Sequence, residues 1–454
     1  MSGLLSALST ANSGLQAQQF GLQTVGNNIA NANTAGYSRV DVTFNETGVS
    51  PPLGGGLTAD ARRATSAFVT AQLNSNGASS AFSDAKSGSL TRLEAVLSPT
   101  TSGAASIRSS LTGLSNSFVN LSADASSVPQ RQDVLAKLQA VATQFNQAAS
   151  ALTSERGSLN SQVAQVATQA TQLASKVAAL NSQITSAEAS GGEASSLRDQ
   201  RDQAAQQLIA IIGGQALTDT KGSMTILAAG TAIVAGGKSS TLSVSTNAAT
   251  GMNDVIATDW QGSKVNVTAN VSQGELGALV TMRDGTIPGY QAQLDALATS
   301  VSSQMNTVHA AGVGLDGVAG RSLFAAKGGG VVTAANMIVS PDVAGLPNNL
   351  AAAQTAASLP ADNTNATALA GLDFSAGASA LASSVATDAA QNTAASESAS
   401  DRGAVLTGLQ QSAVGVSTDE ETVKLVSLQR GYEANAQVIK VVNDMLSTLV
   451  GMVR

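Results

Sequence analysis

The chain of 454 residues contains no cysteine, and its charged and aromatic residues amount to only 12% and 3%. Without cysteine it cannot form disulfides, thiolate metal sites or a cysteine nucleophile. A single histidine, His309, leaves a transition-metal site with almost no nitrogen ligands. The net charge of −7 argues against a nucleic-acid-binding surface, which needs a basic stripe. The remaining composition is rich in small and polar residues, which suits long helices that pack through small side chains.

The sequence also shows no pattern typical of a targeting segment or of a membrane-spanning segment. The N-terminus has neither the basic nor the continuous apolar segment of a cleavable signal peptide. No stretch approaches 18 uninterrupted apolar residues, so we expect no transmembrane helix and no membrane insertion. A helix lying on a membrane surface would carry Lys or Arg on its polar face, and the N-terminal segment carries neither before Arg39.

No group of residues indicates catalysis. His309 stands alone in a helical segment, where a structural role is far more common than a catalytic one. Asp199 and Asp202 are flanked by Arg198 and Arg201 on an expected helix, and we interpret them as local ion pairs rather than an acid–base pair. No glycine-rich run has the context of a phosphate-binding loop. We therefore predict that the chain is not an enzyme and binds no cofactor or metal.

The first 38 residues contain no Asp, Glu, Lys, Arg or His. Apolar residues recur there at spacings of three and four, the repeat of a helix face that packs against another helix. This pattern predicts a helix from Leu4 to Ile29, with the polar Gln18 interrupting its face. The Asn- and Gly-rich residues that follow favour a helix end and a turn. The face predicted for assembly consists of Leu4, Leu8, Leu15, Leu22, Val25 and Ile29.

The same repeat returns in the last forty residues, with Asn435 as its polar interruption. Ser417 and Glu420 have the spacing of a capping box, so a helix is expected to start there. Chain ends are usually polar and frayed, so two apolar ends imply pairing within the chain, between copies, or both. The second face predicted for assembly consists of Leu425, Leu428, Tyr432, Ile439, Val442, Leu446 and Leu449.

Between the two ends, helical periodicity surrounds one block of short β-prone runs. We predict an α+β fold: a long, discontinuous antiparallel helical bundle formed by both chain ends, with one small, mainly antiparallel β domain inserted in the middle. Residues 326–365 are available to add strands to that domain, such as Val331-Val332 and Ile338-Val339. The predicted parts are a terminal coiled-coil domain (1–44 and 416–454), a helical rod domain (45–213, 276–325 and 366–415) and an outer β domain (214–275, with 326–365 optional).

Several motifs carry a family resemblance. Asn27-Asn28-Ile29-Ala30-Asn31, followed by Asn33-Thr34-Ala35-Gly36-Tyr37, resembles the N-terminal signature of bacterial flagellar axial proteins, the family of rod, hook and hook-associated subunits. Tyr37-Ser38-Arg39, where rod and hook subunits more often have Phe and then Lys, favours the hook-associated members at the hook–filament junction. Further matches run along nearly the whole chain, including 197–202, 274–284 and 429–439. The signature turn comprises Asn31, Asn33, Thr34, Gly36, Tyr37 and Arg39.

The resemblance implies a structural subunit that is exported unprocessed through the flagellar type III apparatus to the extracellular flagellum. There it would polymerise with its own copies between hook and filament and be required for filament attachment. The implied partners are hook subunits, a filament-side junction subunit or flagellin, and an export chaperone that binds the C-terminal helix. Many relatives carry a second β domain, for which residues 326–365 are too few.

Two other functions remain possible on the sequence. The first is a hook or distal-rod subunit, against which Tyr37-Ser38-Arg39 and the long helices of residues 100–212 argue. The second is a surface-binding module in the β domain for glycans or matrix. Residues 214–275 offer no aromatic platform for it, and Trp260 alone is more typical of a core residue.

Overall fold

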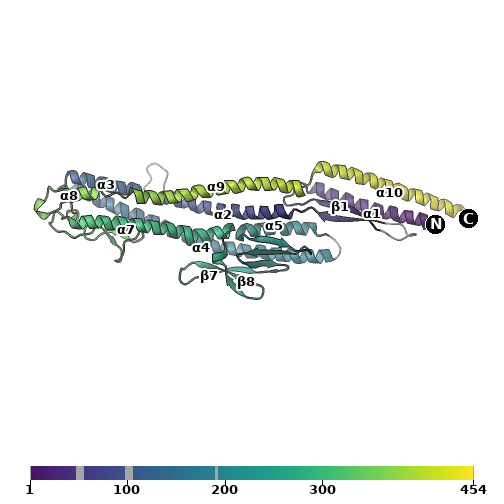
Figure 1. Ribbon diagram of the computed structural model, residues 1–454, viewed down its shortest axis with the longest axis horizontal. Coiled ribbons are helices and arrows are strands. Elements are labelled where there is room, and N and C mark those ends of the chain that lie inside the picture. The colour runs from purple at the N-terminus through teal and green to yellow at the C-terminus, as the bar shows by residue number, and fades with distance from the viewer. Residues whose placement is uncertain (1, 48–55, 98–105, 190–192, 453–454) are drawn as a thin grey trace.

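The computed structural model describes residues 2–47, 56–97, 106–189 and 193–452. The molecule is an elongated rod of helices, with both termini at one end and a β region beside its middle (Figure 1). Helices from the two halves of the sequence lie side by side along the rod. The predicted α+β class and the discontinuous helical bundle are therefore confirmed.

The terminal end is built from two helices and a hairpin. Helix α1 (Ser2–Ala30) runs antiparallel to α10 (Thr418–Met452), and the hairpin of β1 (Val40–Thr47) and β2 (Gly56–Arg63) lies beside α1. The hairpin is tied to the helix where the amide of Leu57 donates to the Ser13 hydroxyl at 3.1 Å. Strand β2 was not predicted, because alanines fill much of its inward face and give a weak alternation signal.

The rod is dominated by one helix of 62 residues, α4, which is about 90 Å long at ~1.5 Å per residue. Apolar residues recur at spacings of three and four from Val134 to Leu152 and again from Val163 to Ile184, and both series lie on this helix. The helices of the rod are α2 (Ala67–Leu97), α3 (Ile107–Ala123), α4 (Val128–Ala189), α5 (Ser195–Ile212), α6 (Gly274–Thr281), α7 (Ile287–Ala311), α8 (Thr364–Ala370) and α9 (Ser375–Val414). Short 3₁₀ or π turns are η1 (Thr268–Asn270), η2 (Met282–Thr286), η3 (Pro347–Asn349) and η4 (Ala356–Ser358).

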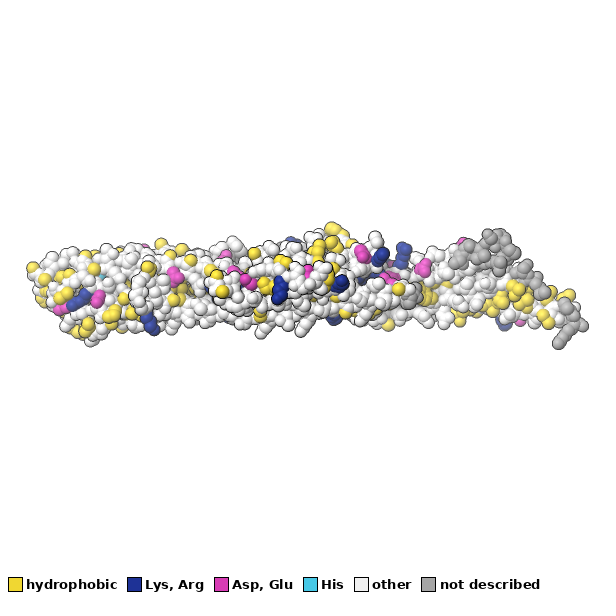
Figure 2. All heavy atoms as spheres, turned by 90° about the horizontal axis from the view of Figure 1, so that it is seen from below, with side chains coloured by type: hydrophobic (Ala, Val, Ile, Leu, Met, Phe, Trp, Pro, Cys, Tyr) yellow, Lys and Arg dark blue, Asp and Glu magenta, His cyan; other side chains and the backbone are white. Residues whose placement is uncertain are grey.

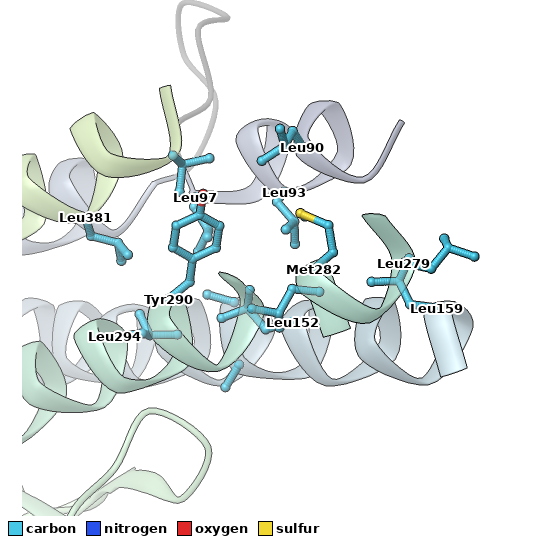
Figure 3. Packing of buried hydrophobic residues seen from close by; sticks show 14 of the residues in the cluster. Leu90, Leu93, Leu97, Leu152, Leu159, Leu279, Met282, Tyr290, Leu294 and Leu381 are labelled. Carbon is cyan, nitrogen blue, oxygen red and sulfur yellow. The ribbon is translucent and has the colours of Figure 1, made fainter. Parts of the chain in front are cut away.

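The apolar core follows the middle of the rod. Side chains from α2, α4, α6, α7 and α9 converge there, among them Leu93, Leu152 and Leu294 (Figure 3). Tyr290 reaches through this core, and its hydroxyl donates to the carboxylate of Asp388 at 2.5 Å. Burial, followed by this carboxylate, raises the pKa of Tyr290. The rod thus has a continuous core of its own, assembled from distant parts of the sequence.

Residues 214–275 form short antiparallel strands, as predicted, but in two sheets. Thr171 and Asn181 of α4 anchor them: the Thr171 hydroxyl donates to the carbonyl of Leu242 at 3.0 Å, and the Asn181 amide donates to that of Met224 at 2.8 Å. One sheet has the order β3-β4-β5-β6 and the other β7-β8-β9. The strands are β3 (Gln215–Thr218), β4 (Met224–Ala228), β5 (Thr231–Ala235), β6 (Lys238–Ser239), β7 (Thr241–Thr246), β8 (Asn253–Thr258) and β9 (Lys264–Asn266).

Strands β10 (Phe324–Ala326) and β11 (Met337–Val339) form a hairpin separate from the two middle sheets. The prediction that residues 326–365 could add strands to the outer β domain is therefore wrong. Ile338-Val339 pair with Phe324 and Ala325 rather than with the middle sheets, and Val331-Val332 lie outside any strand. The amide of Asn306 on α7 holds this hairpin by donating to the Phe324 carbonyl at 2.9 Å. The hairpin therefore belongs to the rod surface.

Candidate assembly interface

Helices α1 and α10 pack against each other, but only one residue of each predicted assembly face is buried. Val25 and Val442 are buried, with 4% and 5% of their surfaces exposed. Tyr432 and Leu449 remain exposed, so the pair covers only part of the predicted C-terminal face. The half-buried members are Leu4, Leu8, Leu15, Leu22, Ile29, Leu425, Leu428, Ile439 and Leu446. Pairing within one chain is thus one use of these faces, and their role between copies stays a prediction.

The polar interruptions of the two seams each face a glycine of the other helix. A Cβ on Gly14 would lie 3.0 Å from the amide of Asn435, and a Cβ on Gly431 would lie 2.9 Å from that of Gln18. One further turn along α1, Gly21 faces Leu428 in the same way. These reciprocal contacts fix an antiparallel register in which large side chains meet small ones.

A second apolar stripe on α10 is left uncovered in the single chain. It includes Val423 and Met452, which are 72% and 79% exposed. Contiguous exposed apolar surface of this kind marks an interaction site. Figure 2 shows hydrophobic side chains gathered near the end of the rod where the termini lie. The exposed apolar residues of α10 are Val423, Val426, Tyr432, Val438, Val441, Met445, Leu449, Val450 and Met452.

A separate helical window, not the α10 stripe, bears on the expectation that no segment could cross a membrane. One window of 18 residues within Thr364–Met452 has a mean hydropathy of 1.2, so by length and composition it could cross a membrane. The sequence expectation considered only uninterrupted runs of apolar residues. A window that mixes apolar and polar residues can still reach a high mean hydropathy. Only 22% of that window is buried in the structure.

The signature turn closes the end of α1. The amide of Asn31 donates to the Asn27 carbonyl at 3.0 Å, and the Thr34 hydroxyl donates to the Asn31 side chain at 3.3 Å. Gly36 has φ of +80°, a left-handed conformation that favours glycine. Asn33 is exposed. The turn reverses the chain and brings Tyr37 back against α1.

Asn28, buried at the end of α1, connects this turn to α10. Its amide donates to the Val40 carbonyl at 2.9 Å and to the Glu421 carboxylate at 2.8 Å. Its carbonyl oxygen accepts from the Tyr37 hydroxyl at 2.8 Å and from the amide of Val40 at 3.1 Å. One side chain therefore uses all of its donors and acceptors to join α1, the turn, β1 and α10.

A charged chain continues from Asn28. Glu421 is fully buried, and the Lys424 ammonium pairs with its carboxylate at 2.7 Å and with Asp41 of β1 at 3.2 Å. Arg39 in turn contacts Asp41 at 3.1 Å. Burial, and then the charges of Asp199 and Glu421, raise the pKa of Tyr37, so its hydroxyl stays protonated as a donor to Asn28.

Asp199 and Asp202 are not simply local ion pairs, which corrects the sequence interpretation. Asp199 accepts from the Arg63 side chain at 2.7 Å and from the amide of Ser38 at 3.3 Å. Asp202 pairs with Arg63 at 2.9 Å as well as with its neighbour Arg201, also at 2.9 Å. Burial raises the pKa of Asp199 despite Arg63. These carboxylates face the terminal part because β2, which was not predicted, brings Arg63 to them.

Sequence reasoning missed the residues that do most of this joining: Asn28, Glu421 and Lys424. The sequence pattern indicates only a helix end around Asn28 and a helix start next to Glu421. A signal was available, since both fall near the inward face of their heptad patterns, where a polar residue needs a partner.

His309 is structural. Its Nδ1–H donates to the Arg321 carbonyl at 2.8 Å, and its Nε2 accepts from the amide of Ala351 at 2.9 Å. Burial is the main cause that lowers its pKa to about 4, so the ring is neutral near pH 7. Among the described residues, no group of three or more His, Asp or Glu side chains is placed to hold a metal ion.

A shallow groove of about 420 Å³ lies between β1, α1 and α10, next to the charged residues Asp41, Glu421 and Lys424. Val42, Phe44 and Val423 give it apolar walls, and Asp41 and Lys424 lie at its edge. It adjoins the exposed stripe of α10, so the two form one continuous surface on the terminal end.

Comparisons with known proteins agree with this architecture. The family model described as "Flagellar hook-associated protein FlgK helical domain" matches residues 90–324. Models of the C-terminal part of flagellar basal body rod FlgEFG proteins and of the flagella basal body rod protein match residues 410–452 and 8–37. The matches thus cover residues 90–324 of the rod and, separately, most of both terminal helices.

Full-length relatives show the same likeness. The chain is 26% identical to flagellar hook-associated protein 1 of Bacillus subtilis (strain 168) over 514 residues, covering 99% of this chain and 98% of that protein. The protein of the same name in Escherichia coli (strain K12) is 26% identical over 330 residues, and the match spans 70% of this chain but only 60% of that protein.

A solved structure is similar to part of the chain. The flagellar hook junction protein FlgK from Burkholderia pseudomallei superposes with a TM-score of 0.50 at 28% identity. The likeness covers 56% of this chain and 46% of that one.

Proposed function

Because the chain belongs to the family of the flagellar hook-associated protein FlgK, we propose that it is a structural subunit that polymerises between the hook and the filament of the bacterial flagellum and is required for filament attachment. The names of the Bacillus and Burkholderia relatives, a hook-associated protein and a hook junction protein, support this position. The motif Tyr37-Ser38-Arg39 supports it from the sequence.

The observation that carries the proposal is the uncovered apolar stripe of α10 beside an uncharged α1. A tubular polymer needs two different complementary faces on each subunit, so that contacts repeat without closing on one pair. The α1–α10 seam leaves Val438, Val441 and Met445 exposed, and at helical spacing these three positions fall on one side of α10. Burial of these side chains against neighbouring copies, hook subunits and a filament-side subunit or flagellin would supply the association energy.

Protein neighbours account for this stripe better than lipid does. Lys440 and Asp444 are exposed on the same helix, and α1 already covers its opposite side. Before assembly, an exposed apolar helix of this kind is a suitable target for an export chaperone. We propose that type III export and such a chaperone bring the subunit unprocessed to its extracellular site, and that no membrane insertion occurs.

We also propose that the protein has no enzymatic activity. Its family consists of flagellar structural proteins. Its one histidine is buried and uses both ring nitrogens in backbone hydrogen bonds.

The experiment is a deletion of the gene, with hooks and filaments counted by electron microscopy and flagellin measured in the medium. The proposal requires complete hooks without filaments and flagellin lost to the medium, with both restored by the intact gene. Filaments in normal number on the mutant would refute it.

A hook or distal-rod subunit is the second candidate, because rod-protein models match residues 8–37 and 410–452. The same deletion separates the two candidates. Loss of a hook or rod subunit would stop the hook itself from forming.

A further inference from the structure

The terminal part and the rod meet at a small polar joint, defined by Ser38, Arg63, Glu193, Asp199 and Asp202. Ser38 and Arg63 enter from the terminal part, at the two chain segments that flank the β1–β2 hairpin. The three carboxylates belong to the rod, in α5 and the segment before it. The joint is separate from the α1–α10 seam and from the rod core.

Arg63 is the centre of the joint. Its Nε donates to Oδ1 of Asp199 at 2.7 Å, and one terminal nitrogen forms ion pairs with the same oxygen at 2.7 Å and with Asp202 at 2.9 Å. Its backbone amide donates to both carboxylate oxygens of Glu193, at 2.9 and 3.1 Å. The side chains of Arg63 and Asp199 are only 10% and 13% exposed, so solvent screens their attraction weakly.

Each side of the joint is held together by its own contacts. The rod has its continuous apolar core, and the terminal part has its α1–α10 seam and the Asn28–Glu421 network. Where α9 gives way to α10, the backbone bond from the Arg39 amide to the Val414 carbonyl, at 2.8 Å, also crosses between the two parts. Opening the Arg63 contacts would therefore leave both parts folded.

We propose that the contact between Arg63 and Asp199 is a latch that fixes the angle of the terminal helix pair to the rod. One guanidinium contacts two carboxylates, Asp199 and Asp202, and these contacts specify its direction as well as its distance, which a single apolar contact at a bend does not. The Ser38 amide, 3.3 Å from the same carboxylate, holds the second strand of the connection in place. Without the latch, the short connections at residues 38–39, 64–66 and 415–417 allow the two parts to bend.

The latch is a property of the single chain and goes beyond the proposed function. A fixed angle lowers the conformational entropy that a subunit loses when it docks, which is the general benefit of preorganisation. Asp199 is well suited to this task because burial disfavours its charge when it is unpaired. Opening the contact with Arg63 would leave this partly buried carboxylate without its partner, which favours the closed contact.

The absence of cysteine allows a direct test by pulsed electron paramagnetic resonance. Spin labels at Ala404→Cys on α9 and Gln429→Cys on α10, both exposed positions, report the distance across the joint in the full chain. The otherwise unchanged chain should give one narrow distance distribution. Asp199→Ala and Arg63→Met should each widen it at least twofold, with helix content by circular dichroism unchanged.

Arg198→Met is the matched control. Arg198 lies on the same helix and makes an equally short pair with Glu188, at 2.7 and 2.8 Å, but entirely within the rod. This variant should keep the narrow distribution. The proposal is overturned if Arg63→Met, folded as judged by its helix content, keeps the narrow distribution, or if Arg198→Met widens it as much.

Discussion

Helices α4 and α10 carry the same heptad pattern but are buried to different degrees. The rod helix α4 buries 21 of its 62 residues, whereas α10 buries only Glu421 and Val442 of its 35. Helices α3, α5, α6 and α7 and the middle sheets all contact α4, while α1 is the main neighbour of α10. The same periodicity therefore produces a closed apolar core around α4 but leaves most of the surface of α10 exposed.

This difference separates folding from assembly along one molecule. The rod encloses enough apolar surface to fold as a single chain. Under the proposed function, the terminal pair, with one seam and an exposed stripe, would gain the rest of its burial from other subunits. In proteins, most of the stability of a helix comes from tertiary packing of its apolar face. The terminal part should thus depend on polymerisation for much of its stability.

The strongest test of the comparison is removal of residues 1–30. We expect complete loss of filament attachment, because α10 then loses its partner and the polymer loses one face. The rod should still unfold cooperatively at nearly its original temperature, since its core does not include α1. Motility and calorimetry measure the two effects. Melting of the rod together with the terminal part would contradict the division.

Single core substitutions should show the same division in energy. Phe145→Ala in α4 removes a side chain with 0% exposure and should lower the free energy of unfolding by about 3–5 kcal/mol. Met445→Ala in α10, where the side chain is 50% exposed, should change it by less than about 0.5 kcal/mol. Urea unfolding measures both values. The second variant should nevertheless reduce filament attachment, and equal losses of stability would remove the distinction.

Acid should destabilise the rod through His309. Its pKa falls from 6.5 to about 4 on folding, so between these values the unfolded chain binds more protons and stability falls as the pH is lowered. The full effect is roughly 3 kcal/mol at ~1.36 kcal/mol per pKa unit. Urea unfolding at pH 7 and pH 5.5 samples the upper part of this range, above the carboxylate transitions.

His309→Leu provides the control for this pH dependence. It should be less stable at every pH, because the Ala351 amide and the Arg321 carbonyl lose their partner. Its stability should hardly change between pH 7 and pH 5.5. A variant that keeps the original slope would assign the titration to another group.

Long heptad segments were predictable because their packing repeats along one helix. Both terminal helices, α4 and α7, appear where the periodicity of Leu, Val and Ile places them. Strand β2 was not predictable, since its inward Ala59 and Ala61 give little hydrophobic contrast. The pairing of Ile338 with Ala325 depends on tertiary anchors such as Asn306, which leave no periodic signal.

The candidate site shows the same limit. Heptad spacing predicted that the two terminal helices pair, but of the predicted faces only Val25 and Val442 are buried, and the close contacts of the pair lie at Gly14, Gly21 and Gly431. Partners of polar residues did not follow the repeat: Asn28 meets Glu421 almost four hundred positions away, and Asp199 meets Arg63 only because a hairpin returns the chain. A buried polar residue requires a partner, but the sequence does not say which one.

The smallest predicted effect concerns one polar residue in each region. In the rod, the Asn181 side chain donates to the carbonyls of Met224 and Gly236, both at 2.8 Å, and accepts from the amide of Met224 at 3.1 Å. In the terminal seam, the side-chain oxygen of Gln18 is buried without a partner among the described residues. An unpaired buried acceptor costs about 1–3 kcal/mol, while a fully bonded one stabilises the fold.

Gln18→Met should therefore stabilise the single chain by about 1 kcal/mol, whereas Asn181→Leu should destabilise it by about 2 kcal/mol. Polar residues in a seam of this kind specify register at a cost in stability, so the Gln18 variant should also pair less uniquely. Urea unfolding gives both energies, and a disulfide between cysteines placed at Gly14 and Asn435 reports the register. If Gln18→Met destabilises the chain as Asn181→Leu does, the amide has a partner in solution, and the terminal seam is as complete as the rod.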